Sequence, residues 1–147
     1  MRNRYGSATG RRRVINPAVD AIPTGMVTFL FSDIEGSTER VRAVGDERWA
    51  ELLELHRSLM RRGFVAHGGA EFGSEGDACF VAFGSALDAV LAATEAQRAI
   101  EGHAWPEEAR IRVRIGLHTG EAVVRDGDYV GHALHLTKRV CGPVRAC

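Results

Sequence analysis

The sequence has no apolar run of the roughly 20 residues that a membrane-spanning helix needs. It has no charge excess either, because 19 Lys and Arg balance 19 Asp and Glu, so no overall field draws the chain to nucleic acid or to an anionic membrane. The three cysteines, Cys79, Cys141 and Cys147, form neither an even disulfide set nor a CxxC metal pair. No internal repeat or low-complexity tract is present. We therefore expect a cytoplasmic, reducing environment.

What the chain does have is the composition of one ordinary domain. It contains 147 residues, of which 45% are hydrophobic and 26% are charged, enough to bury one core. The first 13 residues hold five arginines and no acid, without an amphipathic period or a signal-type apolar core. We interpret residues 1–25 as a flexible basic leader and residues 26–147 as the folded domain.

Hydrophobic periodicity predicts strands that alternate with helices. The expected elements are a strand over 26–32, a short helix from 37, a helix over 47–64, a hairpin over 71–83, a helix that follows Ser85 and ends by Gly102, strands over 110–115 and 121–124, and a helix from about His132. This order favours an α+β fold with a ferredoxin-like βαββαβ core, in which helices pack on one face of an antiparallel sheet.

Two features of these elements have plain structural explanations. His56 lies on the apolar stripe of the second helix, and we interpret it as a histidine at the edge of the core and not as a ligand. Arg110, Arg112 and Arg114 alternate with apolar residues, so they predict a basic outer face of a half-buried strand. We expect these three arginines to be solvated.

Two acids stand beside predicted strand ends. Asp33 follows the strand 26–32 and Asp77 opens the second strand of the hairpin, so adjacent strands of one sheet can bring them together. Mg²⁺ takes hard oxygen ligands, commonly one or two carboxylates plus substrate phosphates. A pair of such ions can activate an attacking hydroxyl and neutralise a leaving pyrophosphate. We therefore predict phosphoryl chemistry at Asp33 and Asp77.

The segment after the first acid suits a phosphate group. Ser37 or Thr38 can cap a helix whose first free amides come from the region of Gly36. Free amides at a helix start attract phosphate.

Three blocks of the sequence resemble the class III adenylyl/guanylyl cyclase family in order and spacing. They are FLFSDIEGST, GSEGDACFVAF and IRVRIGLHTGEAVVRDGDYVGHALHLTKRV. The resemblance implies conversion of ATP into 3′,5′-cyclic AMP and pyrophosphate, with two Mg²⁺ or Mn²⁺ ions per site. It also implies a head-to-tail homodimer in which each subunit supplies half of a site.

The resemblance also implies a role for individual residues. The matched metal ligands are Asp33, Asp77 and the carbonyl of Ile34, and the matched triphosphate turn is Gly36, Ser37 and Thr38. Arg139 matches the arginine that stabilises charge on the phosphoryl oxygens in the transition state. Asp128 matches the aspartate that accepts from the purine amino group in adenine-selective members, which favours ATP over GTP.

Three departures from the family pattern bear on activity. Gly73 occupies the position of the lysine that reads the base, and His135 replaces an asparagine, although imidazole can still donate to a phosphate oxygen. The chain ends eight residues after Arg139, so we expect an incomplete domain at the carboxyl end. A weak or inactive homologue that binds nucleotide or a partner subunit is therefore the main alternative function.

Two other functions fit less of the sequence. HGGAEFGS resembles the turn of diguanylate cyclases, but Ala70 stands where that family has an acidic metal ligand. RNA binding on a ferredoxin-like sheet uses aromatic pairs and a basic run that this chain lacks.

Overall fold

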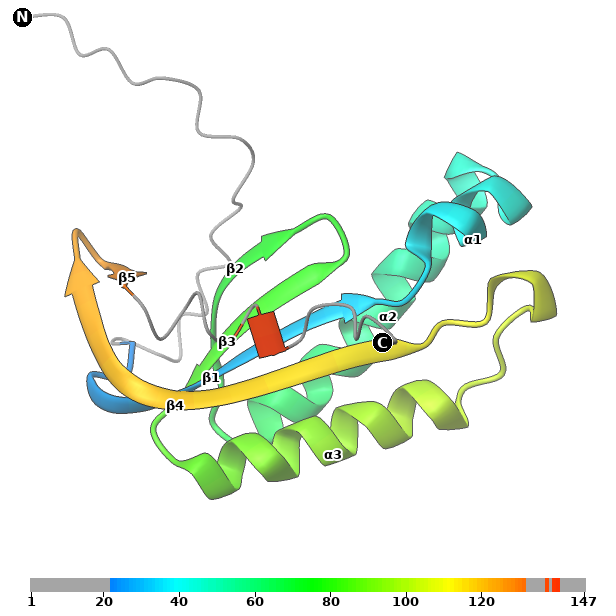
Figure 1. Cartoon of the computed structure of the whole chain (residues 1–147). Helices are drawn as coiled ribbons and strands as arrows, with labels where there is room; N and C mark the ends of the chain where they lie inside the picture. Colours follow the sequence, from blue (N-terminus) through cyan, green and yellow to red (C-terminus); the bar gives the residue numbers. More distant parts are fainter. Residues whose placement is uncertain (1–21, 132–136, 138, 141–147) are drawn as a thin grey trace, which may run out of the picture.

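The structure of the protein is a computed structural model that describes residues 22–131, 137, 139 and 140. These residues form one sheet, and the two long helices pack against one of its faces (Figure 1). The elements, in order, are β1 (Gly25–Ile34), α1 (Ser37–Val44), α2 (Asp46–Ala66), β2 (Ala70–Glu75), β3 (Ala78–Phe83), α3 (Ala86–Gly102), a 3₁₀ turn (Glu107–Ala109), β4 (Val113–Arg125) and β5 (Asp128–Val130).

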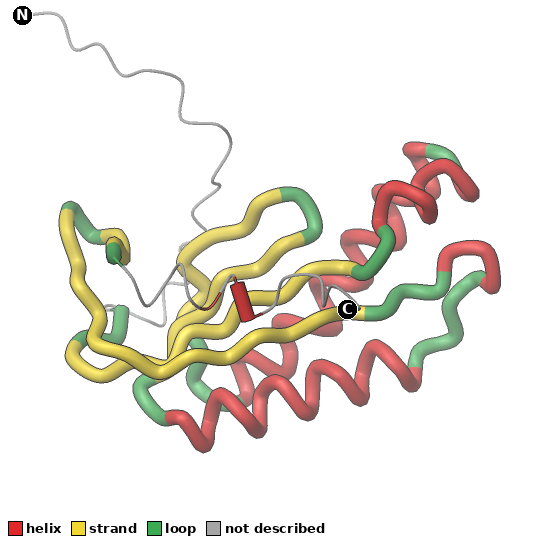
Figure 2. The backbone as a smooth tube through the Cα atoms, viewed as in Figure 1, coloured by secondary structure: helices red, strands yellow, loops and turns green. Residues whose placement is uncertain are grey.

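The sheet has the strand order β2-β3-β1-β4-β5, and every pairing in it is antiparallel. β1 is therefore central, between two strands that come much later in the chain. The path β1, α2, β2, β3, α3, β4, which Figure 2 traces, is the ferredoxin-like βαββαβ arrangement. This confirms the expected α+β fold class.

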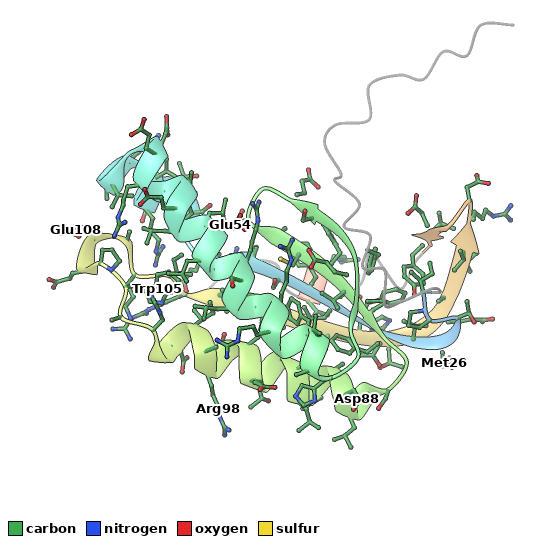
Figure 3. All side chains as sticks on the ribbon, turned by 180° about the vertical axis from the view of Figure 1, so that it is seen from behind. Met26, Glu54, Asp88, Arg98, Trp105 and Glu108 are labelled. Carbon is green, nitrogen blue, oxygen red and sulfur yellow. The ribbon has the colours of Figure 1, made fainter. Side chains whose placement is uncertain are left out.

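α2 and α3 cover one face of the sheet and bury the main core (Figure 3). Successive side chains of a strand point to opposite faces, so Leu30 and Ile34 of β1 lie on the helix side. Phe64 of α2 and Ile100 of α3 pack against them and are almost fully buried. No helix among the described residues is long and apolar enough to cross a membrane.

The opposite face of the sheet carries a cluster of aromatic rings. Phe29, Phe72 and Tyr129 meet edge to face, with centroids 4.9 to 6.1 Å apart. The hydroxyl of Tyr129 donates to the carbonyl of Pro23 at 2.6 Å, so the ring also has a polar anchor. The short helical segment that contains residues 137, 139 and 140, drawn in red in Figure 1, lies over this face of the sheet, and Thr137 in it is buried.

Several local predictions are confirmed. The apolar stripe gives α2, although His56 on it is fully buried and lies inside the core, not at the edge where we expected it. The hairpin exists as β2 and β3. Ser85 is the N-cap of α3, since its Oγ accepts from the backbone N–H of Asp88 at 3.3 Å.

The prediction of two separate strands over 110–115 and 121–124 is wrong. β4 runs unbroken from Val113, and Gly116 and Gly120 lie within it without positive φ. The reason is the long ladder with β1, which pairs ten consecutive residues of each strand. The ladder satisfies the backbone of the GLHTG segment and leaves no need for a turn there.

β5 was not predicted, although its turn was. Asp126 and Gly127 both have positive φ, which is the geometry of a two-residue turn that returns the chain as an antiparallel hairpin. The helix expected from about His132 lies mostly outside the described residues, of which 137, 139 and 140 are helical. The boundary between leader and domain stays a prediction, since residues 1–21 also lie outside them.

Candidate functional site

The two acids singled out in the sequence lie on neighbouring strands. Asp33 is the penultimate residue of β1, and Asp77 immediately precedes β3, the strand that pairs with β1. The backbone N–H of Ile34 donates to Oδ2 of Asp77 at 2.7 Å. The carboxylate of Asp77 is therefore fixed against the backbone of the residue that follows Asp33.

Asp33 has a side-chain partner that its neighbours in the sequence do not predict. Arg114 lies opposite Asp33 in the β1–β4 ladder, and its Nε and Nη2 donate to the two carboxylate oxygens, each at 2.7 Å. The expectation that Arg114 is only solvated is therefore wrong. The pairing depends on the register between β1 and β4, which strand alternation within one segment does not reveal.

The turn after Ile34 is shaped by a glycine. Gly36 is the N-cap of α1 with a φ of 61°, so the capping by Ser37 or Thr38 that we expected is wrong: Ser37 already belongs to the first helical turn, and no side chain caps the helix. A Cβ on Gly36 would lie 2.7 Å from Nη1 of Arg40. The first amides of α1 stay available to a ligand oxygen.

Arg40 holds this turn in place. Its guanidinium donates to the carbonyl of Glu35 and, through Nε, to the carbonyl of Arg110 at 2.6 Å. The N–H of Glu35 donates to the carbonyl of Arg112 at 2.9 Å. The turn is thus tied to the segment that leads into β4.

The donor set at the two acids suits a magnesium ion that arrives with a phosphate ligand. The described residues contain no group of three or more His, Cys, Asp and Glu side chains able to hold a metal on their own. Asp33, Asp77 and the carbonyl of Ile34 offer oxygen ligands only. Mg²⁺ commonly binds to one or two carboxylates and completes its shell with phosphates and water, so the residues fit.

Cys79 lies two residues beyond Asp77 but offers no nucleophile. Its side chain is buried, and burial raises the pKa of the thiol to about 11. Because the thiolate is the reactive form, covalent catalysis at this position is disfavoured.

Comparison with known sequences decides the family. Residues 19–131, more than half of the chain, match the adenylate and guanylate cyclase catalytic domain. The chain belongs to this family. The cyclase resemblance noted in the sequence is thereby confirmed.

Two relatives show the range of the family match. The cyclase domain is 36% identical over 137 residues to an uncharacterised protein of Mycobacterium tuberculosis, covering 88% of this chain and 45% of that protein. It is 30% identical over 155 residues to an adenylate cyclase of Lachancea kluyveri, covering 88% of this chain and 8% of that one. The chain thus spans less than half the length of these relatives.

Solved cyclase structures share the fold. A structure of adenylate cyclases from Trypanosoma brucei in their monomeric state aligns with a TM-score of 0.69 and 26% identity, over 83% of this chain and 72% of that one. An adenylate/guanylate cyclase/hydrolase from Silicibacter pomeroyi aligns with a TM-score of 0.70 and 27% identity, over 78% and 68%.

Asp128, the predicted base-reading residue, lies far from Asp33 along the sheet. Asp128 begins β5, which pairs with the far end of β4: Asp128 is opposite Arg125, eleven positions beyond Arg114 (125 minus 114). At about 3.3 Å per residue these positions are on the order of 35 Å apart along the strand. Asp33 and Asp128 of one chain therefore do not share a site.

Gly73 lies in β2 opposite Phe80, next to a shift in the β2–β3 register. A Cβ there would touch only Cδ2 of Phe80, at 3.5 Å, so the position has room for a side chain. Arg139 is helical and exposed. His135 lies outside the described residues.

Proposed function

We propose that this cyclase domain converts ATP into 3′,5′-cyclic AMP and pyrophosphate, with Mg²⁺ or Mn²⁺ held by Asp33, Asp77 and the carbonyl of Ile34. The proposal is supported chiefly by the bond from the N–H of Ile34 to Asp77, which holds that carboxylate at the end of β1 where Asp33 and Ile34 lie, next to the uncapped start of α1. ATP and a reducing milieu for the buried, unpaired Cys79 are both found in the cytoplasm, where we place the reaction.

In this proposal, backbone amides and an arginine of the chain bind the triphosphate. The amides of Ser37 and Thr38 bind phosphate oxygens at the start of α1. Arg114 pairs with both carboxylate oxygens of Asp33, and its guanidinium would serve the phosphates where Asp33 holds a cation. Two bound divalent cations would lower the pKa of the ribose 3′-hydroxyl and neutralise the leaving pyrophosphate.

In this proposal Arg139 and His135 act at the α-phosphate. Arg139 stabilises the charge that grows on the phosphoryl oxygens, and His135 donates a further hydrogen bond. Asp128 accepts from the purine amino group and so favours ATP over GTP.

A head-to-tail homodimer reconciles these roles with the distances. Asp33 and Asp128 lie at opposite ends of β4, so one complete site takes its metal end from one subunit and its base-reading end from the other.

The test is a cyclase assay with ATP and with GTP in the presence of Mn²⁺ or Mg²⁺. Asp33→Asn should lower cyclic nucleotide formation by about 100-fold or more, since it removes a cation ligand. Asp46→Asn, the same change at an exposed acid of α2, is the matched control and should leave the rate unchanged. Equal rates in both variants would refute the assigned site.

A nucleotide-binding or dimerisation module without turnover is the second candidate. It is favoured by Gly73, which cannot read a base, and by His135 in place of an asparagine. Metal-dependent ATP binding that Asp33→Asn abolishes, with no cyclic product from the unmodified chain, would establish this function instead.

A further inference from the structure

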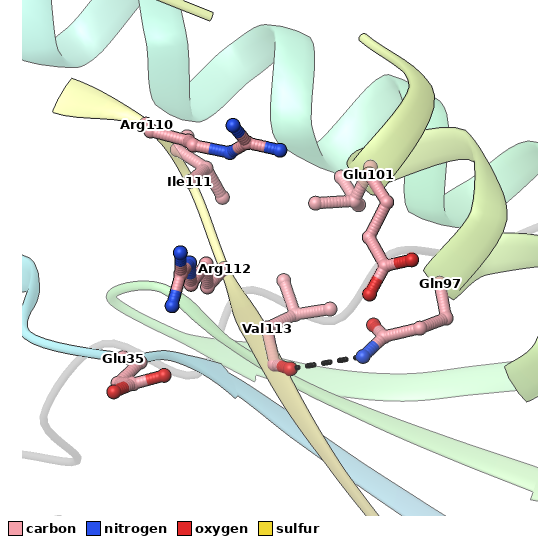
Figure 4. Close-up of a pocket in the computed structure, with 8 residues that line it drawn as sticks. Glu35, Gln97, Glu101, Arg110, Ile111, Arg112 and Val113 are labelled. Carbon is pink, nitrogen blue, oxygen red and sulfur yellow. Dashed lines mark hydrogen bonds between the residues drawn. The ribbon is translucent and has the colours of Figure 1, made fainter. Parts of the chain in front are cut away.

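The two segments that carry the candidate metal ligands are held unequally. Asp33 and Ile34 end β1 and are both paired with β4. This pairing continues beyond the strand, because the N–H of Glu35 donates to the carbonyl of Arg112 at 2.9 Å, and Figure 4 shows these two residues on adjacent segments. The sheet itself therefore fixes the backbone around Asp33.

Asp77 lies in a loop instead. β2 and β3 are joined by two residues, Gly76 and Asp77, and the pairing of β3 with β1 ends at Cys79, two residues away from Asp77. Gly76 has a φ of 57°, and a Cβ built on it would meet no atom within 4 Å, so nothing packs against this residue. Since loops hold functional groups less precisely than strands do, a metal ligand here needs a restraint from outside the sheet.

Helix α2 supplies that restraint. It runs beside the hairpin of β2 and β3 (Figures 1 and 3), and Nη2 of Arg57 donates to the carbonyl of Gly76 at 2.5 Å. Because a peptide unit is planar, this carbonyl lies in one plane with the nitrogen and the Cα of Asp77. The bond from Arg57 thus sets the point from which the side chain of Asp77 leaves the backbone.

The guanidinium of Arg57 has one further contact, which is weak. Its Nη1 lies 3.8 Å from Oε2 of Glu54, whose side chain is 72% exposed, and surface ion pairs of this kind contribute little. The bond to Gly76 is therefore its main interaction among the described residues. Asp77 is held at both ends, since α2 fixes its backbone and the N–H of Ile34 binds its carboxylate.

We propose that Arg57 is a positioning residue for the metal ligand Asp77. It holds the loop so that the carboxylate is in place before a divalent cation arrives. This inference rests on the proposed function, because it requires Asp77 to bind the cation. Groups that orient metal ligands in this way typically change metal affinity by about 10- to 100-fold.

Electrostatics alone predicts the opposite result. Arg57 is positively charged, so a neutral replacement would tighten the binding of a nearby cation if charge were the only factor. Positioning predicts weaker binding. The sign of the change in affinity therefore distinguishes the two explanations.

The first test needs no metal. The N–H of Ile34 is bonded to Asp77, so its hydrogen exchange, followed by nuclear magnetic resonance on the full chain, reports whether the carboxylate is in place. Arg57→Met should speed exchange of this amide by about fivefold or more, whereas Arg57→Lys, which keeps a donor on a long side chain, should retain most of the protection. An unchanged rate in Arg57→Met would overturn the proposal.

The second test measures Mn²⁺ affinity by electron paramagnetic resonance, without nucleotide. Arg57→Met should weaken Mn²⁺ binding by about tenfold, and Arg57→Lys should recover most of the affinity. Arg61→Gln is the matched control, because Arg61 lies one turn further along α2 and holds the same hairpin through Glu71 of β2, at 2.9 and 3.2 Å. It should lower stability in urea but leave Mn²⁺ affinity unchanged.

The outcomes separate this inference from the proposed function. Tighter or unchanged Mn²⁺ binding in Arg57→Met, or an equal loss in Arg61→Gln, would show that Arg57 does not position the ligand, even where Asp77→Asn abolishes binding and the metal site stands. Equal Mn²⁺ binding by Asp77→Asn and the unmodified chain would refute the metal site of the proposed function, and the role of Arg57 with it.

Discussion

The imidazole of His56 is the least satisfied polar group in the core. It is fully buried, and neither ring nitrogen has a hydrogen-bond partner of normal geometry among the described residues. Replacement by leucine conserves volume approximately, removes two unsatisfied polar atoms and improves helix propensity. We expect His56→Leu to raise the free energy of unfolding at pH 7.5 by about 1 kcal/mol, the low end of the cost of an unsatisfied buried group.

The effect should grow at acidic pH. Burial, and secondarily the charge of Arg57, lowers the pKa of His56 from 6.5 to about 4. Above pH 6.5 the imidazole is neutral in both states, whereas between pH 6.5 and about 4 the unfolded chain binds a proton that the folded chain excludes, so stability falls as the pH falls. This difference between the folded and unfolded pKa of His56 lowers the free energy of unfolding by about 3 kcal/mol at its full extent, because one pKa unit corresponds to about 1.4 kcal/mol.

Urea denaturation from pH 7.5 down to pH 4.5 measures both effects. The stability difference between His56→Leu and the unmodified chain should widen toward low pH by about 2 to 3 kcal/mol. His103→Leu, at a partly exposed histidine after α3, is the matched control and should leave the acid slope in place. A His56→Leu protein that is less stable at pH 7.5, or that keeps the full slope, would refute this account of His56.

Three further predictions concern the cyclase site. Arg114→Gln should tighten Mn²⁺ binding in the absence of nucleotide by about fivefold and should lower turnover. Binding tightens because the variant removes a partly exposed ion pair with Asp33 that is worth about 1 kcal/mol. A paramagnetic titration that finds weaker Mn²⁺ binding would contradict this. Gly73→Lys should lower the apparent KM for ATP relative to GTP in steady-state kinetics, and an unchanged purine preference would count against the alignment there. Gly36→Ala should cost about 1 to 2 kcal/mol in urea denaturation, from the positive φ and the contact with Arg40; unaltered stability would show that the turn relaxes freely.

Local signals in the sequence sufficed for the helices and the hairpin. The apolar spacing of α2 and the N-cap at Ser85 depend on neighbours within a few residues, and both are confirmed. The same reasoning failed for β4, where Gly116 and Gly120 resemble a turn but are held in a strand by pairing with β1, a partner about 90 residues away. Tertiary pairing overrode the local preference.

In the candidate site, too, features set by nearby residues were predicted and features set by distant strand pairing were not. Asp33 and Asp77 were found because acids at strand ends stand out in the sequence, and the cyclase family is confirmed. Arg114 was missed because its relation to Asp33 exists only in the register of two strands, and the N-cap at Gly36 was missed because a hydroxyl nearby was the more obvious candidate. The roles of these residues in catalysis stay predictions.

The length of β4 has a consequence for how this domain can change over evolutionary time. Tyr129 seats the short β5 hairpin in the aromatic cluster on its own, far from Arg114 at the other end of the strand. Substitutions at widely separated positions without shared partners combine nearly additively. Within one chain, substitutions around Tyr129 should therefore alter stability independently of substitutions at the acidic end. Asp128 is the exception, because in the proposed homodimer it shares a nucleotide with Asp33 of the other subunit.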